Sequence, residues 1–206
     1  MPQPIRITPA SRARLPVLAA VLGRAFLHDP MIRWPMAEAP DMQDRIAEVF
    51  SNIYREFMET GTMWEAGEGA GFAHWVPPGG AGDALESTDR IMASLRPLTD
   101  DDGARYLTLW AWIEERIPAD VWYLDMIGVD PLRQGKGIGT ALMRLGLDHA
   151  AGAGADAFLE TAVEANVAFY ERFGFRVVEE GAPVEGCPNI WFMRTDREFT
   201  REKEGP

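Results

Sequence analysis

The chain has 206 residues, 47% of them hydrophobic and 25% charged, a composition typical of a globular domain with one substantial core. Its formal net charge of −12 argues against a broad nucleic-acid-binding surface, which needs clustered Lys and Arg, and is compatible with a cationic small-molecule ligand. No apolar run approaches the roughly 18–20 residues that span a bilayer, so we expect no membrane-embedded segment.

The first 118 residues carry both strand and helix patterns. Ser11 is a suitable N-cap for the first helix and Gly61 a suitable terminator for the second. Short apolar runs bounded by turns predict strands over residues 5–10, 62–66 and 71–78, of which the last two form a hairpin. Apolar residues recurring every three or four positions predict helices over residues 11–27, 41–60, 84–95 and 101–117. The intervening segments 28–35 and 79–87 predict a helix break and a Gly-rich loop.

The remaining residues alternate between strands and helices. A strand is predicted over 121–129, ending at Asp130-Pro131, and the loop that follows opens a helix running to about Ala151. Further along the chain we expect strands over 156–161, 175–180 and 189–195, with a short helix over 166–173. No linker or repeat divides the chain. We therefore predict one mixed α/β domain over 1–196, followed by a loose charged tail over 197–206.

A glycine-rich loop precedes the helix that runs to Ala151, in the sequence "DPLRQGKGIGTALM" (130–143). A Walker phosphate loop is excluded because Lys136 is followed by Gly137, and a dinucleotide fingerprint is disfavoured because position 140 is Thr. The pattern Q-x-x-G-x-G is met by Gln134, Gly137 and Gly139. Unpaired backbone N–H groups at a helix N-terminus favour an anion, so the loop predicts binding of a phosphate or pyrophosphate.

A second motif follows in "FLETAVEANVAFYERFGF" (158–175), which contains Asn166 and Tyr170. Together with "WYLDMIGVDP", "QGKGIG" and the closing "WFMRT", it resembles the GNAT superfamily of acetyl-CoA-dependent N-acyltransferases. Within that superfamily it is similar to the puromycin N-acetyltransferase type, which also accounts for "GFAHWVPP" and "RAFLHDP". The likeness is dense over residues 121–195 and thin before them.

The resemblance implies a fold and a cofactor site. The fold is a central, mostly antiparallel sheet of about seven strands, splayed at 121–129 and covered by helices on both faces. Residues 1–118 would form the acceptor side and 119–196 the acetyl-CoA-binding half. The strand groups of Ile127, Gly128 and Val129 would pair with pantetheine, with the Ile127 N–H stabilising the thioester oxygen. The pyrophosphate would lie on the amides of Gln134, Gly135, Lys136, Gly137, Ile138, Gly139 and Thr140, and Asn166 would contact CoA beyond the thioester.

The resemblance also implies catalytic roles. Tyr170 matches the family's general acid, which protonates the departing thiolate, and a phenol is protonated at neutral pH as this task requires. Three alternatives stay open for removal of the amine proton: Asp125, Glu160 or bulk water. Alternation along the strand puts residues 123, 125, 127 and 129 on one face, so Asp125 would project near the thioester, as a base or as a binding group for the substrate ammonium.

Aromatic residues are the candidates for substrate binding. Trp75, at the end of the predicted hairpin, is the favoured pocket residue, with Phe26 and Tyr123 as further contacts. The wider set of residues that could form an aromatic wall is Phe26, His28, Trp34, Trp75, Trp110 and Trp112. No spacing of His, Cys and carboxylates is typical of a metal site, and the single Cys187 makes a thiolate zinc site implausible.

We therefore predict an acetyl-CoA-dependent N-acetyltransferase that acts on the primary amine of a small cationic molecule by direct attack in a ternary complex. The alternatives are a non-catalytic acyl-CoA sensor, an enzyme that acetylates a protein or peptide amine, and a nucleotide-dependent enzyme. The resemblance to the puromycin type implies an aminonucleoside or related amine and a role in antibiotic resistance. A single cysteine and the absence of an apolar leader predict a cytoplasmic protein, and either a monomer or a homodimer is compatible with the sequence.

Overall fold

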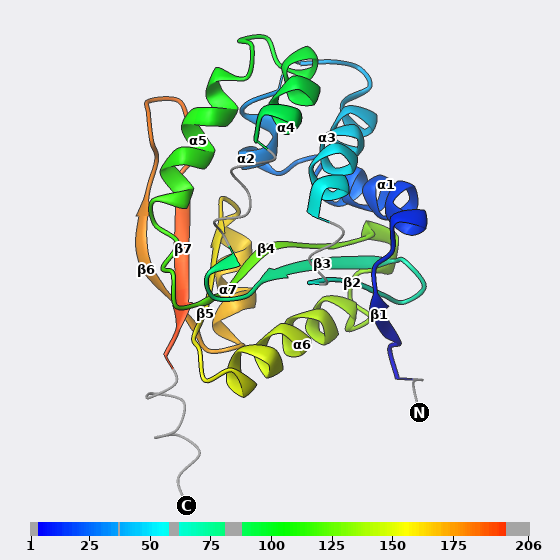
Figure 1. The fold of residues 1–206 in the computed structure, drawn as a ribbon, viewed down its shortest axis with the longest axis vertical. Coiled ribbons are helices and arrows are strands. Elements are labelled where there is room, and N and C mark those ends of the chain that lie inside the picture. Colours follow the sequence, from blue (N-terminus) through cyan, green and yellow to red (C-terminus); the bar gives the residue numbers. More distant parts are fainter. Residues whose placement is uncertain (1–3, 37, 58–61, 81–87, 197–206) are drawn as a thin grey trace, which may run out of the picture.

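The computed structural model describes residues 4–36, 38–57, 62–80 and 88–196 (Figure 1). The predicted helix terminator Gly61, most of the Gly-rich loop over 79–87 and the predicted tail over 197–206 lie outside the described residues. Within the described ranges, no helix has the length and apolar character needed to cross a membrane.

A seven-stranded open sheet forms the centre of the molecule, in the order β1-β2-β3-β4-β5-β7-β6. Neighbouring strands are antiparallel except β4 and β5, which are parallel. This confirms the predicted fold class and strand number. The strands are β1 (Ile7–Pro9), β2 (Met63–Ala66), β3 (Gly71–Val76), β4 (Trp122–Val129), β5 (Ala157–Thr161), β6 (Phe175–Gly181) and β7 (Ile190–Thr195).

Helices cover both faces of this sheet (Figure 1). The helices are α1 (Leu15–Ala25), α2 (Pro30–Arg33), α3 (Met42–Phe57), α4 (Thr88–Leu95), α5 (Ala104–Glu114), α6 (Ile138–Gly152) and α7 (Glu164–Glu171). One face packs against α6 and α7 through a core that includes Leu142 and Tyr170. On the other face, α1, α3 and α4 form a second core, and α2 and α5 cover the half of the sheet that contains β5 and β7.

The N-terminal helical region differs from its prediction in two places. Ser11 precedes a 3-10 turn over Arg12–Arg14 and makes no side-chain cap, and α1 begins at Leu15 with a proline in its first turn. Proline suits that position because the first turn needs no N–H donor. The predicted break over 28–35 contains the one-turn helix α2, because the carboxylate of Asp29 accepts hydrogen bonds from the Met31 and Ile32 amides at 2.9 and 3.2 Å.

The two parallel strands at the centre of the sheet separate soon after they begin. Strand β4 pairs with β5 through Trp122–Ala157 and Tyr123–Phe158, and the structure gives no further pairing between these two fully described strands. The expected splay is therefore present. Beyond Tyr123, the β5-facing edge of β4 has no strand partner among the described residues, so its backbone groups there can pair with an extended ligand.

A β-bulge interrupts the pairing of β3 with β4. Trp75 lies opposite Leu124 and His74 opposite Met126, so Asp125 is the extra residue. The predicted common face for residues 123, 125, 127 and 129 is therefore wrong. Tyr123, Asp125 and Met126 face the α3 and α5 side, whereas Ile127 and Val129 pack with Leu124 in the core beneath α6. The bulge gives β4 two consecutive side chains on the same side of the sheet.

Candidate active site

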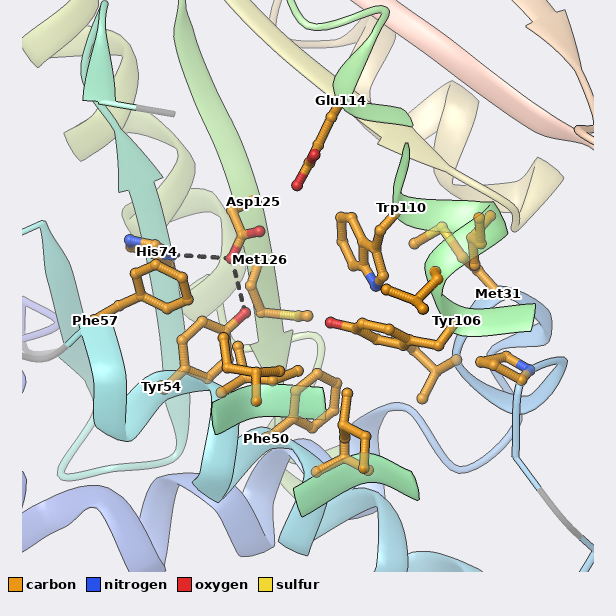
Figure 2. A pocket seen from close by; sticks show the side chains of 18 of the residues that line it. Met31, Phe50, Tyr54, Phe57, His74, Tyr106, Trp110, Glu114, Asp125 and Met126 are labelled. Atoms are coloured by element: carbon orange, nitrogen blue, oxygen red, sulfur yellow. Dashed lines mark hydrogen bonds and ion pairs between the residues drawn. The ribbon is translucent and has the colours of Figure 1, made fainter. Parts of the chain in front are cut away.

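A cavity of about 410 Å³ lies between the helices of the first half and the middle of β4 (Figure 2). Its wall is built from α2, α3, α4, α5, the end of β3 and the first half of β4. Most of the lining is apolar or aromatic. Asp125 and Glu114 are its acidic residues, and no Lys or Arg occurs among the described residues that line it. This size and polarity are typical of a small-molecule site.

Asp125 is held at the cavity wall by two side chains from different elements. The Tyr54 hydroxyl on α3 and His74 Nδ1 on β3 each lie 2.9 Å from Asp125 Oδ2 (Figure 2). Because a carboxylate only accepts, His74 donates this hydrogen bond from Nδ1. Burial, followed by the charge of Asp125, raises the pKa of Tyr54 well above its usual value, so its hydroxyl stays a donor. Within the described residues, Asp125 Oδ1 has no partner.

Glu160, at the end of β5, forms a second carboxylate site. Its Oε1 accepts a hydrogen bond of 2.8 Å from the Tyr123 hydroxyl, and its buried Oε2 has no partner within the described residues. Burial raises the pKa of Glu160 to about 8; the hydrogen bond from Tyr123 opposes this rise and the charge of Asp125 adds to it. Glu160 is therefore a carboxyl group that titrates near neutral pH.

Tyr170 lies on α7, buried between aromatic rings. Its ring centroid is 5.3 Å from that of Phe169 and 6.1 Å from that of Phe175, both in edge-on arrangements. Burial, and then the charge of Glu160, raises the pKa of Tyr170 above its usual value. The phenol is therefore protonated across the physiological pH range. The influence of Glu160 also places these two titratable groups within electrostatic range of each other.

The glycine-rich loop forms an exposed turn directly before α6. Gly135 and Gly137 have φ of +72° and +82°, a region that favours glycine, and residues 131–137 are exposed. The Ala141 N–H makes a helical hydrogen bond of 2.9 Å to the Gly137 carbonyl. The amides before it are those that a helix leaves unpaired, so they form a cradle for an anion.

This cradle lies next to the end of β4 and to α7. A Cβ atom at Gly139 would lie 3.6 Å from Val129 Cγ2 and 3.8 Å from Phe169 Cζ. At the start of the loop, Asp130 accepts a hydrogen bond from the Leu132 N–H at 3.0 Å and forms an ion pair with Arg24 of α1 at 2.5 Å. The Arg24 guanidinium is the main cause of the lowered pKa of Asp130. Sequence reasoning missed Arg24, which anchors the loop to α1.

The predicted substrate contacts lie in different parts of the molecule. Tyr123 lines the cavity, whereas Phe26 packs edge-on against Phe50 in the core beside α1. The structure does not place Trp75 in the cavity for which it was predicted. Its side chain is fully buried beneath α6, on the opposite face of the sheet. A Cβ atom at Gly146 would clash with its indole, so the absence of a side chain there provides the space that the indole fills.

Two further predicted residues lie outside the cavity lining. Asn166, at the start of α7, has its Nδ2 atom 3.4 Å from the Thr161 hydroxyl at the end of β5, next to the splay. Trp112 packs on Phe192, at 5.2 Å between ring centroids, and does not line the cavity. Among the described residues, no three His, Cys, Asp or Glu side chains are grouped to hold a metal ion.

Several cavity residues were not identified from the sequence as parts of a site. They are Tyr54, His74, Tyr106 and Glu114; Trp110, which also lines the cavity, was named only within the wider aromatic set. Of these, His74 had a local signal, since a histidine in an otherwise apolar strand calls for a polar partner. The others lie on helices whose buried faces are predictable but whose partners are not.

A family model and a related protein both show that this chain is similar to acetyltransferases. Residues 44–175 match the model of the acetyltransferase (GNAT) family. The chain is 29% identical over 169 residues to an uncharacterized N-acetyltransferase of Schizosaccharomyces pombe, covering 76% of this chain and 68% of that protein.

Two solved structures show the same fold. A structure described as histone acetyltransferase HPA2 and related acetyltransferase, from Corynebacterium glutamicum, has a TM-score of 0.63 at 20% identity, over 94% of this chain and 97% of that one. A polyamine N-acetyltransferase of Drosophila melanogaster has a TM-score of 0.61 at 13% identity, over 93% and 99%.

Proposed function

Since this chain belongs to the acetyltransferase (GNAT) family, we propose that it transfers an acetyl group from acetyl-CoA to the primary amine of a small cationic molecule. The observation that carries the proposal is the position of β4. Its splayed edge lies beside the glycine cradle of α6, and its bulge presents Asp125 to a largely apolar cavity on the other side. One strand thus connects a site for an anionic donor with a site for a cationic acceptor.

On the donor side, the chain offers backbone groups to acetyl-CoA, its co-substrate. The amides of residues 134–140 receive the pyrophosphate, and the free edge at Ile127, Gly128 and Val129 pairs with the pantetheine arm. The Ile127 N–H donates to the thioester oxygen, which gains negative charge during attack. Asn166, beside the splay, contacts CoA beyond the thioester. In this proposal residues 119–196 form the donor half, and residues 1–118 form the acceptor half together with Tyr123, Asp125 and Met126 of β4.

The chemical step is a direct attack within a ternary complex. The neutral amine nitrogen forms a bond to the acetyl carbon, the carbon–sulfur bond breaks, and the thiolate leaves with the bonding electrons. Tyr170 donates its phenolic proton to that sulfur, and its raised pKa keeps it protonated until negative charge develops there. The proton lost by the amine replaces it through solvent, so the phenol is regenerated.

The proposed reaction allows three routes for removal of the amine proton. Asp125 faces the cavity directly and either binds the ammonium or accepts its proton. Glu160 becomes ionised only as the pH approaches about 8, so a route through Glu160 requires mildly alkaline conditions for full rate. The third route is transfer to bulk water. These routes are distinguished by the pH dependence of kcat/KM, which reports the groups that titrate in the free enzyme.

The finer assignments follow from the sequence resemblance. We propose that acceptors include an aminonucleoside of the puromycin kind or a related amine, with antibiotic resistance as the consequence. We also propose a cytoplasmic location, which the single cysteine favours, and a monomer or homodimer as the working state. No metal is required for the proposed reaction.

The test is release of free thiol from acetyl-CoA in the presence of a panel of amines that includes puromycin and a peptide with a free N-terminus. We expect turnover with one or more small amines. Thermal protection by acetyl-CoA without turnover of any amine would instead indicate a sensor, and faster turnover of the peptide would indicate a protein acetyltransferase. Protection by ATP or NAD but not by CoA would refute the donor assignment.

A further inference from the structure

We infer that the acceptor is an amine with a single positive charge carried on an aromatic body, and that its ammonium group binds Oδ1 of Asp125. This inference rests on the proposed function and names its acceptor class. It excludes polyamines as preferred acceptors, although the solved structures of this fold include a polyamine N-acetyltransferase.

The aromatic body follows from the chemistry of the cavity wall. Tyr106 and Trp110, from successive turns of α5, lie with ring centroids 6.0 Å apart at 54°, and their side chains border the cavity opposite Asp125 (Figure 2). Rings at such angles offer both edges and faces to a further ring. Thioether sulfurs, which favour aromatic neighbours, come from the lining residues Met31, Met36, Met92 and Met126.

The single charge follows from the distribution of carboxylates. Both hydrogen bonds to Asp125, from Tyr54 and His74, are made to Oδ2, and within the described residues Oδ1 has no partner. The second oxygen of Asp125 faces the space bounded by Trp110, Tyr106 and Glu114 (Figure 2). One ammonium group therefore finds one free acceptor on a carboxylate that is fixed in place.

The second or third ammonium group of a polyamine would have a weaker partner in this cavity than Asp125. Glu114, the other acidic lining residue, is exposed, so water screens its attraction for an ammonium group placed beside it. The remaining wall is largely apolar, and an ammonium group placed against it without a partner is costly. A polyamine would therefore leave charges uncompensated in this cavity, whereas an aromatic monoamine would place its ring against the wall.

The first experiment compares kcat/KM for 2-phenylethylamine, 2-cyclohexylethylamine, agmatine and spermidine. We expect 2-phenylethylamine to exceed both polycations by at least about tenfold and the cyclohexyl analogue by a smaller factor. Equal or faster turnover of agmatine or spermidine would overturn the inference. If no amine is acetylated, the proposed function fails, and equilibrium binding of 2-phenylethylamine then decides the inference: saturable binding lost in Asp125→Asn supports it, and no binding overturns it.

The second experiment uses two tryptophans of α5 as a matched pair. Trp110 lines the cavity, whereas Trp112 packs on Phe192 and below the Arg116 guanidinium, which lies 4.0 Å from its ring. We expect Trp110→Ala to reduce the preference for 2-phenylethylamine over spermidine by at least about fivefold. Trp112→Ala should preserve that ratio even where it lowers thermal stability. An unchanged ratio in Trp110→Ala, or equal changes in both variants, would contradict the assignment.

Discussion

Two glycines with the same backbone conformation separate the structural role of the glycine loop from its proposed binding role. Gly135 has φ of +72° and lies in the loop before α6, and Gly186 has φ of +83° and lies between β6 and β7. Apart from its chain neighbours, a Cβ atom added at either position would meet no atom of the described residues within 4 Å. The substitutions Gly135→Ala and Gly186→Ala therefore impose the same kind of backbone strain and no steric clash within the protein.

The expected magnitudes follow from this match. Left-handed backbone costs a non-glycine residue about 1–2 kcal/mol, so both variants should lose a similar free energy of unfolding, measured by urea denaturation. Position 135 lies in the loop proposed to bind the CoA pyrophosphate, whereas position 186 lies in the connection between β6 and β7. We expect Gly135→Ala to raise the Kd for CoA at least about tenfold, or about 1.4 kcal/mol, and Gly186→Ala to leave it unchanged in isothermal titration calorimetry. Equal CoA affinity in the two variants would refute the reasoning.

Three further substitutions test the chemistry. Tyr170→Phe should lower kcat by about 10²-fold with unchanged CoA affinity in a thiol-release assay, because it removes the proton donor, and an unchanged kcat would exclude Tyr170 as the acid. Asp125→Asn should raise KM for the amine about 10–100-fold, the value of a charge-assisted hydrogen bond, while Glu114→Gln changes it less; the reverse order would place the ammonium elsewhere. Glu160→Gln tests the raised pKa of Glu160. Between about pH 4.5 and about pH 8 the folded protein keeps a proton on this group that the unfolded chain has lost, so the free energy of unfolding of the wild type should fall with rising pH by up to about 1.4 kcal/mol per pH unit. The variant should lack this slope. The same pH slope in Glu160→Gln would assign it to another group.

The donor half of the molecule was predictable because its signals are local. The strand over 121–129, the exposed glycines and the helix that follows them are adjacent in sequence, and each has its own propensity or capping pattern. The structure places β4 and α6 within one or two residues of those predictions. The glycines at 135 and 137 also have the positive φ that such a loop requires.

The acceptor side was not predictable because it depends on contacts between distant segments. The bulge at Asp125 exists only in the pairing of β4 with β3, about fifty residues earlier, and it reverses the face of Ile127 and Val129. Trp75 faces α6 because Gly146 leaves room for its indole seventy-one residues later. The cavity itself depends on how the apolar faces of α3, α4 and α5 meet. The spacing of apolar residues along a helix predicts which face is buried, but not which element that face packs against.

Hydrogen–deuterium exchange with and without CoA tests the central claim most directly, because the claim concerns particular backbone amides. We predict that saturating CoA slows exchange in peptides covering residues 127–129 and 134–140, while the strands β6 and β7 at the far side of the sheet are unaffected. Saturable binding of CoA that protects another region, or no protection at these amides, would contradict the account.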